Sequence, residues 1–294
     1  MHFTTIAPLL LLATKQVAAH GLITRIHGAN GVVMPGLTVV DGTPRDCPSG
    51  ACGGQKDTAI IRDPEMGTSE ASALGRTMSG PVDPKRVIVQ FMGSSAQKRA
   101  HTRHFPQARQ LANDAASIFT TAGGTVLNGA QDLADATPLG NVVKGAQSTV
   151  DTMTAGATGT KPGVMTPDGT VENGLQEYAG KGAAHGLPSV SGDGYITVIY
   201  HQVNQDGAGP LHADVDATSG GTDPKAFKPA KVVENIPGVA GASTTSTMDF
   251  EVKIQVPAGT KCTGVVDGIE NVCIVRVRNS AISGPFGGSA AFTN

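Results

Sequence analysis

Residues 195–203 read YITVIYHQV, and this stretch decides the fold class. Its β-branched and aromatic side chains, set in an alternating pattern, predict a strand of a β-sheet. Four later stretches have the same texture: 211–218 (LHADVDAT), 249–257 (DFEVKIQVP), 262–266 (CTGVV) and 272–279 (VCIVRVRN). Many short strands separated by turn signals predict a β-sandwich.

Short apolar pieces broken by Gly and Pro occupy residues 20–95. They predict further strands over 22–26 (LITRI), 32–40 (VVMPGLTVV) and 86–92 (RVIVQFM). The whole chain holds 39 Gly and 18 Pro among 294 residues, only 16% of residues are charged, and Trp is absent. This composition favours a loop-rich, mainly β protein over a helical bundle.

Residues 96–185 differ from the rest because they are rich in Ala, Gly and Thr. We interpret them as a helical insertion packed on the β-sandwich core, within one domain that spans 20–294. Helical spacing of Leu111, Ala115, Ile118 and Phe119 predicts a helix over 106–121. Weaker helical patterns cover 126–136 and 139–153, and 155–170 looks like a linker. The alternative is that 122–170 are partly disordered.

The N-terminus has the pattern of a secretory signal peptide over residues 1–19. Residues 6–13 form the apolar run IAPLLLLA, and Val17 and Ala19 fit the −3 and −1 positions of a cleavage site. The run is too short to cross a bilayer, and no later stretch is long enough. We therefore expect a soluble, secreted, extracellular protein.

Four cysteines agree with folding in the oxidising secretory route, and they allow three pairings. We favour the local pairs Cys47–Cys52 and Cys262–Cys273. A crossed pairing, which would tie the N-terminal loop to the C-terminal strands, is the alternative.

The formal net charge of −2 argues against nucleic-acid and anionic-membrane partners. Removing the leader takes away Lys15, its one charged residue. The number of basic residues then falls from 22 to 21 while the 24 acidic residues remain, so the net charge becomes −3. We expect the mature protein to act as a monomer.

Cleavage after Ala19 would make His20 the first residue of the mature chain. A terminal histidine offers its α-amino group and its ring Nδ1, which together can chelate one metal ion. A second histidine would complete a T-shaped site of three nitrogens that suits copper. The alternative is that His20 is merely the first mature residue.

Among the other histidines, His201 is the best second ligand, because it ends an apolar strand and precedes a polar loop. That loop offers possible outer partners for the ring: Gln202, Asn204, Gln205 and Asp206. A hydrogen-bonded residue at a strand edge is the alternative reading. The runners-up are His27, His101, His104, His185 and His212.

Three other groups of residues carry weaker signals. Lys98, Arg99 and Arg103 surround His101 and His104, and this positive charge disfavours a cation there. Three isolated carboxylates do not form a convincing glycosidase pair: Asp41, Asp214 and Asp216. The C-terminal GPFGGSAAF predicts a tight turn that presents Phe286.

Several segments closely resemble the fungal appressorium-specific secreted proteins, the powdery-mildew-type virulence factor family. They are residues 20–47 (HGLITRIHGANGVVMPGLTVVDGTPRDC), 71–77 (ASALGRT), 201–224 (HQVNQDGAGPLHADVDATSGGTDP) and 272–292 (VCIVRVRNSAISGPFGGSAAF). The resemblance covers nearly all of the mature chain. It implies a protein made while a pathogenic fungus forms its infection cell and penetrates the host surface.

That family is similar, more distantly, to lytic polysaccharide monooxygenases. This similarity implies an immunoglobulin-like β-sandwich that holds one copper ion between an N-terminal histidine and a second histidine at a strand end. His20 and His201 occupy the matching contexts, with Gly209-Pro210 downstream, and Phe286 is the candidate for the axial aromatic position. It also implies oxidation of host or fungal cell-wall polysaccharide.

The chain departs from the monooxygenases in its aromatic residues, because it has no Trp and only Tyr178, Tyr195 and Tyr200. A flat aromatic platform is not expected, so polar contacts would carry glycan binding, or the substrate is a soluble or amorphous chain. The alternative function is a non-catalytic secreted effector that binds a wall or host surface component. A copper-scavenging wall protein is a third hypothesis.

Overall fold

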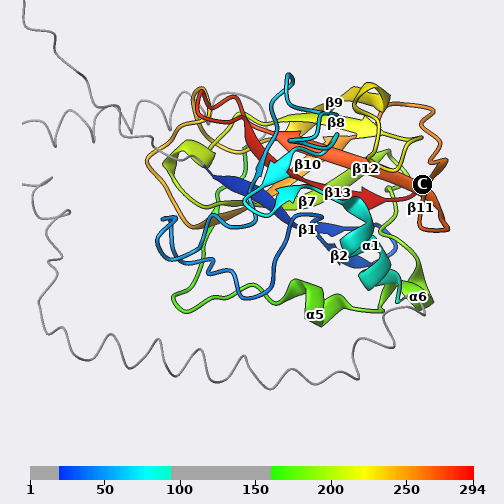
Figure 1. The fold of residues 1–294 in the computed structure, drawn as a ribbon, viewed down its shortest axis with the longest axis horizontal. Coiled ribbons are helices and arrows are strands. Elements are labelled where there is room, and N and C mark those ends of the chain that lie inside the picture. Colours follow the sequence, from blue (N-terminus) through cyan, green and yellow to red (C-terminus); the bar gives the residue numbers. More distant parts are fainter. Residues whose placement is uncertain (1–19, 94–159) are drawn as a thin grey trace, which may run out of the picture.

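A computed structural model describes residues 20–93 and 160–294 of the chain (Figure 1). The predicted leader and the helices predicted over 106–121, 126–136 and 139–153 lie outside the described residues. Within them, the protein is mainly β, as the strand patterns predicted, and its strands join into a single antiparallel sheet with few helices.

The order of the strands places the N-terminal strand beside one strand from the second half of the chain. The sheet runs β2-β1-β7-β10-β9-β8-β12-β13-β3-β4-β5, with β11 beside β12 and β6 beside β10. The strands are β1 Gly21–His27, β2 Val33–Pro35, β3 Ala59–Ile60, β4 Arg76–Thr77, β5 Gly80–Pro81, β6 Val164–Met165, β7 Tyr195–Gln202, β8 His212–Asp216, β9 Phe227–Glu234, β10 Met248–Gln255, β11 Gly264–Val266, β12 Ile269–Arg278 and β13 Phe286–Phe292.

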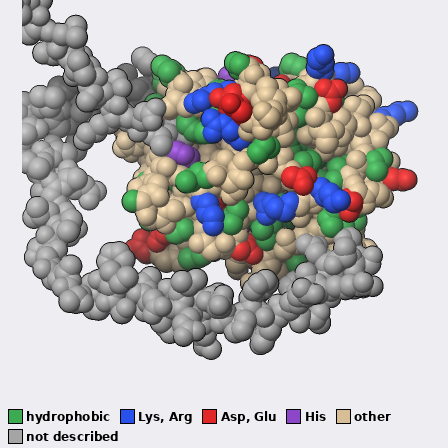
Figure 2. Space-filling view, viewed as in Figure 1, with side chains coloured by type: hydrophobic (Ala, Val, Ile, Leu, Met, Phe, Trp, Pro, Cys, Tyr) green, Lys and Arg blue, Asp and Glu red, His purple; other side chains and the backbone are tan. Residues whose placement is uncertain are grey.

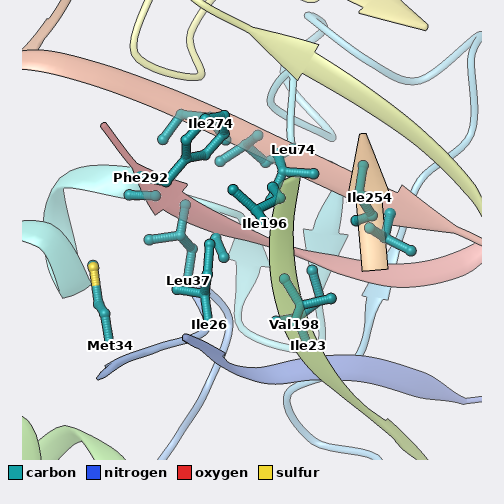
Figure 3. Close-up of a cluster of buried hydrophobic side chains, with 14 of the residues drawn as sticks. Ile23, Ile26, Met34, Leu37, Leu74, Ile196, Val198, Ile254, Ile274 and Phe292 are labelled. Carbon is teal, nitrogen blue, oxygen red and sulfur yellow. The ribbon is translucent and has the colours of Figure 1, made fainter. Parts of the chain in front are cut away.

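The sheet curls so that β1 packs against β13, although these strands are six places apart in the strand order. Gly288 of β13 allows this close approach, because a Cβ there would lie 2.8 Å from the backbone N of Ile23. Side chains from both halves meet in a common core (Figure 3). Its buried members include Ile23, Ile26, Met34, Leu37, Leu74, Ile196, Val198, Ile254, Ile274 and Phe292.

The prediction of a strand over 86–92 is wrong, because these residues belong to helix α1, Pro84–Met92. The Asp83 side chain accepts a hydrogen bond from the Lys85 N–H, proline occupies the first turn, and Gly93 ends the helix in the left-handed conformation. These are strong start and stop signals. The β-branched side chains of the segment are buried on one helical face rather than in a sheet.

The other strand predictions agree well with the structure, but six strands were missed, of which β3, β4, β5 and β6 have two residues each. The stretches 22–26, 195–203, 211–218, 249–257, 262–266 and 272–279 correspond to β1, β7, β8, β10, β11 and β12, whereas 32–40 contains only the short β2. The two long strands that sequence patterns missed are β9, which contains Pro229, and β13, which was expected only as a turn. Gly and Pro weaken the local signal of both strands.

The described end of the predicted insertion carries two short helices, α5 Gly174–Tyr178 and α6 Gly182–His185. They dock on α1, where the Gln90 side chain donates to the Leu175 carbonyl at 3.1 Å and the Gln90 carbonyl accepts from Gly180 N–H at 3.0 Å. Arg45 adds a buried link from the N-terminal loop, because it pairs with both Asp57 and Glu172 at 2.7 Å.

Both local disulfides are present, Cys47–Cys52 and Cys262–Cys273, which confirms the favoured pairing. Positive and negative side chains are interspersed on the face seen in Figure 2, in agreement with the small net charge. Among residues 20–93 and 160–294, none of the helices is long and apolar enough to cross a membrane.

Candidate functional site

The pairing of β1 with β7 brings His20 and His201 to the same end of two neighbouring strands. Leu22 lies opposite His201, and the register continues past the start of β1, where Val203 N–H donates to the His20 carbonyl at 3.0 Å. His20 and His201 are therefore diagonal neighbours across the strand pair, an arrangement that separates Cα atoms by roughly 7–8 Å and lets long side chains meet.

His201 is completely buried, and its two ring nitrogens have different surroundings. Nδ1 lies 2.7 Å from Oδ1 of Asp249, which faces it from β10. Nε2 is buried without a hydrogen-bond partner in the described parts of the chain. A carboxylate only accepts hydrogen bonds, so Nδ1 carries the proton, and in the neutral ring Nε2 presents its lone pair. Such a nitrogen can bind a metal ion.

The loop after β7 holds the backbone of His20. The His20 N–H donates to Asn204 Oδ1 at 2.7 Å, and a Cβ at Gly207 would overlap the His20 carbonyl oxygen. The Tyr200 hydroxyl supports this loop by donating to the Gly207 carbonyl at 3.0 Å. Burial raises the pKa of Tyr200, which keeps the hydroxyl protonated as a donor.

Phe286 packs against His20, with ring centroids 5.0 Å apart, and is itself buried. Asn279 fixes it there, because its side chain accepts from Phe286 N–H at 3.0 Å and donates to the carbonyl of Asp206 at 2.8 Å. The aromatic residue singled out in the sequence thus lies beside the first histidine, although it starts β13 rather than sitting in a turn.

The loop residues expected to support His201 act differently. Asn204 contacts the backbone of His20, and the Gln202 side chain donates to Ser243 Oγ at 2.9 Å and to the Thr245 carbonyl at 2.6 Å. Asp249 takes the place beside the His201 ring. Sequence reasoning missed it because nothing local shows that the strand beginning there pairs with β7.

The remaining candidates lie elsewhere. His27, His185 and His212 are on β1, α6 and β8, and His101 and His104 are outside the described residues.

Each isolated carboxylate has a structural partner: Asp41 accepts from backbone N–H groups of α5, Asp214 pairs with Arg276, and Asp216 accepts from the turn that follows it. The described segments hold no cluster of three or more His, Cys, Asp or Glu side chains suited to a metal.

The three tyrosines lie on separate parts of the fold. Tyr200 is fully buried, whereas Tyr178 in α5 and Tyr195 at the start of β7 are partly exposed. A lysine ammonium lies over each of these two rings, with Lys181 Nζ 4.2 Å and Lys253 Nζ 4.5 Å from the ring centroid.

Comparisons with known proteins place the chain in a family. The model of the Egh16-like virulence factors matches residues 18–287. The appressoria-specific virulence factor GAS2 of Pyricularia oryzae is 46% identical over 301 aligned residues, which cover all of this chain and 89% of that protein. The appressoria-specific virulence factor GAS1 of the same fungus is 37% identical over 106 residues, or 36% of this chain and 41% of its own. No solved structure matches significantly. The chain belongs to the Egh16-like virulence factor family.

Proposed function

We propose that this protein is secreted from the fungal infection cell and that its mature form binds one copper ion through His20 and His201. The names of its relatives support a role in appressoria. The sequence of residues 1–19 supports export and cleavage before His20. We also propose that the curled sheet is an immunoglobulin-like sandwich, because its two halves pack through β1 and β13.

The observation that carries the copper proposal is the environment of His201. Its Nε2 is buried without a hydrogen-bond partner in the described residues, while Asp249 holds Nδ1 at 2.7 Å. A bare buried ring nitrogen is costly unless something binds it. Metal-binding histidines characteristically donate their other ring N–H to a carboxylate or carbonyl. His201, held by Asp249, is therefore suited to bind a metal ion as a neutral imidazole.

His20 supplies the second part of the proposed site. Once residues 1–19 are removed, its nitrogen becomes an α-amine, which can donate a hydrogen bond to Asn204 and still offer its lone pair. The donors would be this amine, the His20 ring and Nε2 of His201, a set of nitrogen ligands that suits copper. Phe286, packed on the His20 ring, would shield one side of the site.

The chemistry proposed for the site is oxidation of cell-wall polysaccharide. Bound copper would supply the activation of oxygen or peroxide needed to oxidise a C–H bond. The protein's own part is to hold the imidazoles in position through Asp249 and through the loop that contains Asn204 and Gly207. A non-catalytic, wall-binding effector would share the fold and lack this activity.

The decisive experiment measures copper binding to mature protein that begins at His20. We expect one tightly bound Cu(II) with a type-2 electron paramagnetic resonance spectrum. His201→Ala should abolish tight binding, and His212→Ala, at an exposed histidine in the other half of the sheet, is the matched control. Tight binding that survives His201→Ala would contradict the proposed site.

A second form of the protein tests the role of the amine. One extra residue before His20 converts the α-amine into an amide, so copper affinity should fall as strongly as in His201→Ala. The polysaccharide step is tested by incubating copper-loaded protein and a reductant with chitin, cellulose, xylan and glucans. Oxidised oligosaccharides that disappear in His201→Ala support the oxidase, whereas copper binding without products on any glycan favours the effector.

A further inference from the structure

We infer that the surface over β1, β7 and β10 binds a neutral glycan chain in a groove that leads away from the His201 site. A cavity of about 380 Å³ lies on this part of the sheet. Six of its lining residues, called here the β7 groove, are His27 of β1, Tyr195, Thr197 and Ile199 of β7, and Glu251 and Lys253 of β10. These three strands are neighbours in the sheet (Figure 1).

The β7 groove and His201 share one face of β7. Side chains alternate along a strand, so Tyr195, Thr197, Ile199 and His201 point to the same side. The residues of β10 that pair with His201, Ile199 and Thr197 lie on the same face. They are Asp249, Glu251 and Lys253, in that order. Tyr195 and His201 are six residues apart, about 20 Å along the strand, so an extended chain bound in the groove can extend to the end of β7 where the buried His201 lies.

The lining of the groove suits the mixed surface of a sugar. Ile199 and the ring of Tyr195 offer apolar surface against C–H faces, and Thr197 offers a hydroxyl group. His27 is a further polar contact: burial, and then the charge of Arg25, lower its pKa. The neutral imidazole that results can both donate to and accept from hydroxyl groups.

The cavity is lined by charges of both signs, Asp193 and Glu251 against Lys253, which favours an uncharged ligand. Glu251 pairs with Lys161 at 2.9 Å, and Lys253 lies over the Tyr195 ring. A polyanion would have to approach Glu251 and Asp193, and a polycation would have to approach Lys253. A chain of neutral sugars meets neither repulsion.

This inference names a substrate-binding surface for the proposed function, and its test does not need copper. Binding of cellohexaose and laminarihexaose to metal-free mature protein is measured by calorimetry, with polygalacturonate and chitosan oligomers as charged probes. We expect a neutral hexamer to bind, and Tyr195→Ala to weaken it about tenfold through loss of ring contact. Tyr178→Ala is the matched control, because that tyrosine also lies beneath a lysine but on α5.

Thr197→Lys provides a second variant that fills the groove without removing an aromatic ring, and it should abolish binding while the thermal midpoint stays near that of the wild type. Binding of neither neutral hexamer, stronger binding of a charged probe, or equal losses in Tyr195→Ala and Tyr178→Ala would overturn the inference. Hexamer binding retained in His201→Ala would support the groove even if the copper proposal failed.

Discussion

Asp249 holds the ring of His201 from the neighbouring strand, with Oδ1 of the carboxylate 2.7 Å from Nδ1. The two residues are direct cross-strand partners between β10 and β7, although 48 positions separate them in the chain. The contact fixes the tautomer and the orientation of an imidazole whose other nitrogen is buried. The geometry of the proposed copper site therefore depends on the register in which β10 pairs with β7.

Replacing Asp249 should weaken copper binding without removing a ligand. In Asp249→Ala the ring of His201 loses its hydrogen-bond acceptor, and we expect copper affinity to fall by about 10–100-fold. Competition with a chelator of known affinity measures the change. In the metal-free protein, nitrogen NMR should show Nδ1 protonated in the wild type and a mixture of tautomers in the variant.

Glu251→Ala is the control for Asp249→Ala, because Glu251 lies two residues further along the same face of β10. It should leave copper affinity unchanged. An equal loss in both variants would mean that negative charge on this face, and not the contact to His201, supports the metal.

Gly207 should be sensitive to the smallest side chain. A Cβ at this position would overlap the carbonyl oxygen of His20, which is backbone and cannot rotate away. Gly207→Ala should therefore displace His20, destabilise the protein by about 1–3 kcal/mol and weaken copper binding. Gly192→Ala is the control, because a Cβ there meets no atom within 4 Å. Urea unfolding and chelator competition measure the two effects, and a Gly207→Ala protein with wild-type affinity would contradict the expectation.

Arg45 pairs with two carboxylates that have little contact with water. Its guanidinium contacts Asp57 at 2.7 and 3.0 Å and Glu172 at 2.7 and 2.9 Å, and all three side chains are buried. Arg45→Met removes the ion-pair partner of both buried carboxylates, so the free energy of unfolding should fall by about 3–5 kcal/mol. Lys85→Met, which breaks the exposed pair with Asp267, should change stability little. Urea denaturation compares the two variants, and similar losses would argue against burial as the cause.

Asp216 should make stability depend on pH in the acid range. Burial raises the pKa of this carboxyl, but hydrogen bonds from the Ser219 hydroxyl and from backbone N–H groups of the turn outweigh it and hold the pKa below its usual value. A lowered pKa means that the stabilisation is complete above the unfolded value of about 3.9 and is lost as pH falls through the folded value.

Asp216→Asn removes the charged acceptor, so at pH 7 it should lower the unfolding free energy by about 1–3 kcal/mol. The difference from the wild type should shrink as the pH falls below about 3.9. Urea titrations at pH 7 and pH 3 measure it, with the exposed Asp168→Asn as the control. A difference that is constant with pH would show that the charge of Asp216 is not what stabilises the turn.

Local patterns predicted much of the fold because they act within a few residues. Alternation and β-branching identified β7, β8, β10 and β12, and short spacing favoured the two disulfides that are present. The same reasoning failed over 86–92, where Asp83, Pro84 and Gly93 impose a helix on β-branched residues. It also missed β13, whose glycines have low strand propensity but allow β1 to pack closely.

The sequence by itself determined the mainly β class, the family and the two histidines worth testing, and it favoured the cysteine pairs that the structure has, because each depends on local spacing or on similarity along the chain. Only the tertiary structure decided that Asp249 supports His201, that Phe286 packs on His20 and that a groove runs along β7. These contacts join strands that are far apart in sequence, and strand pairing is set by the packing of the whole core rather than by any single segment.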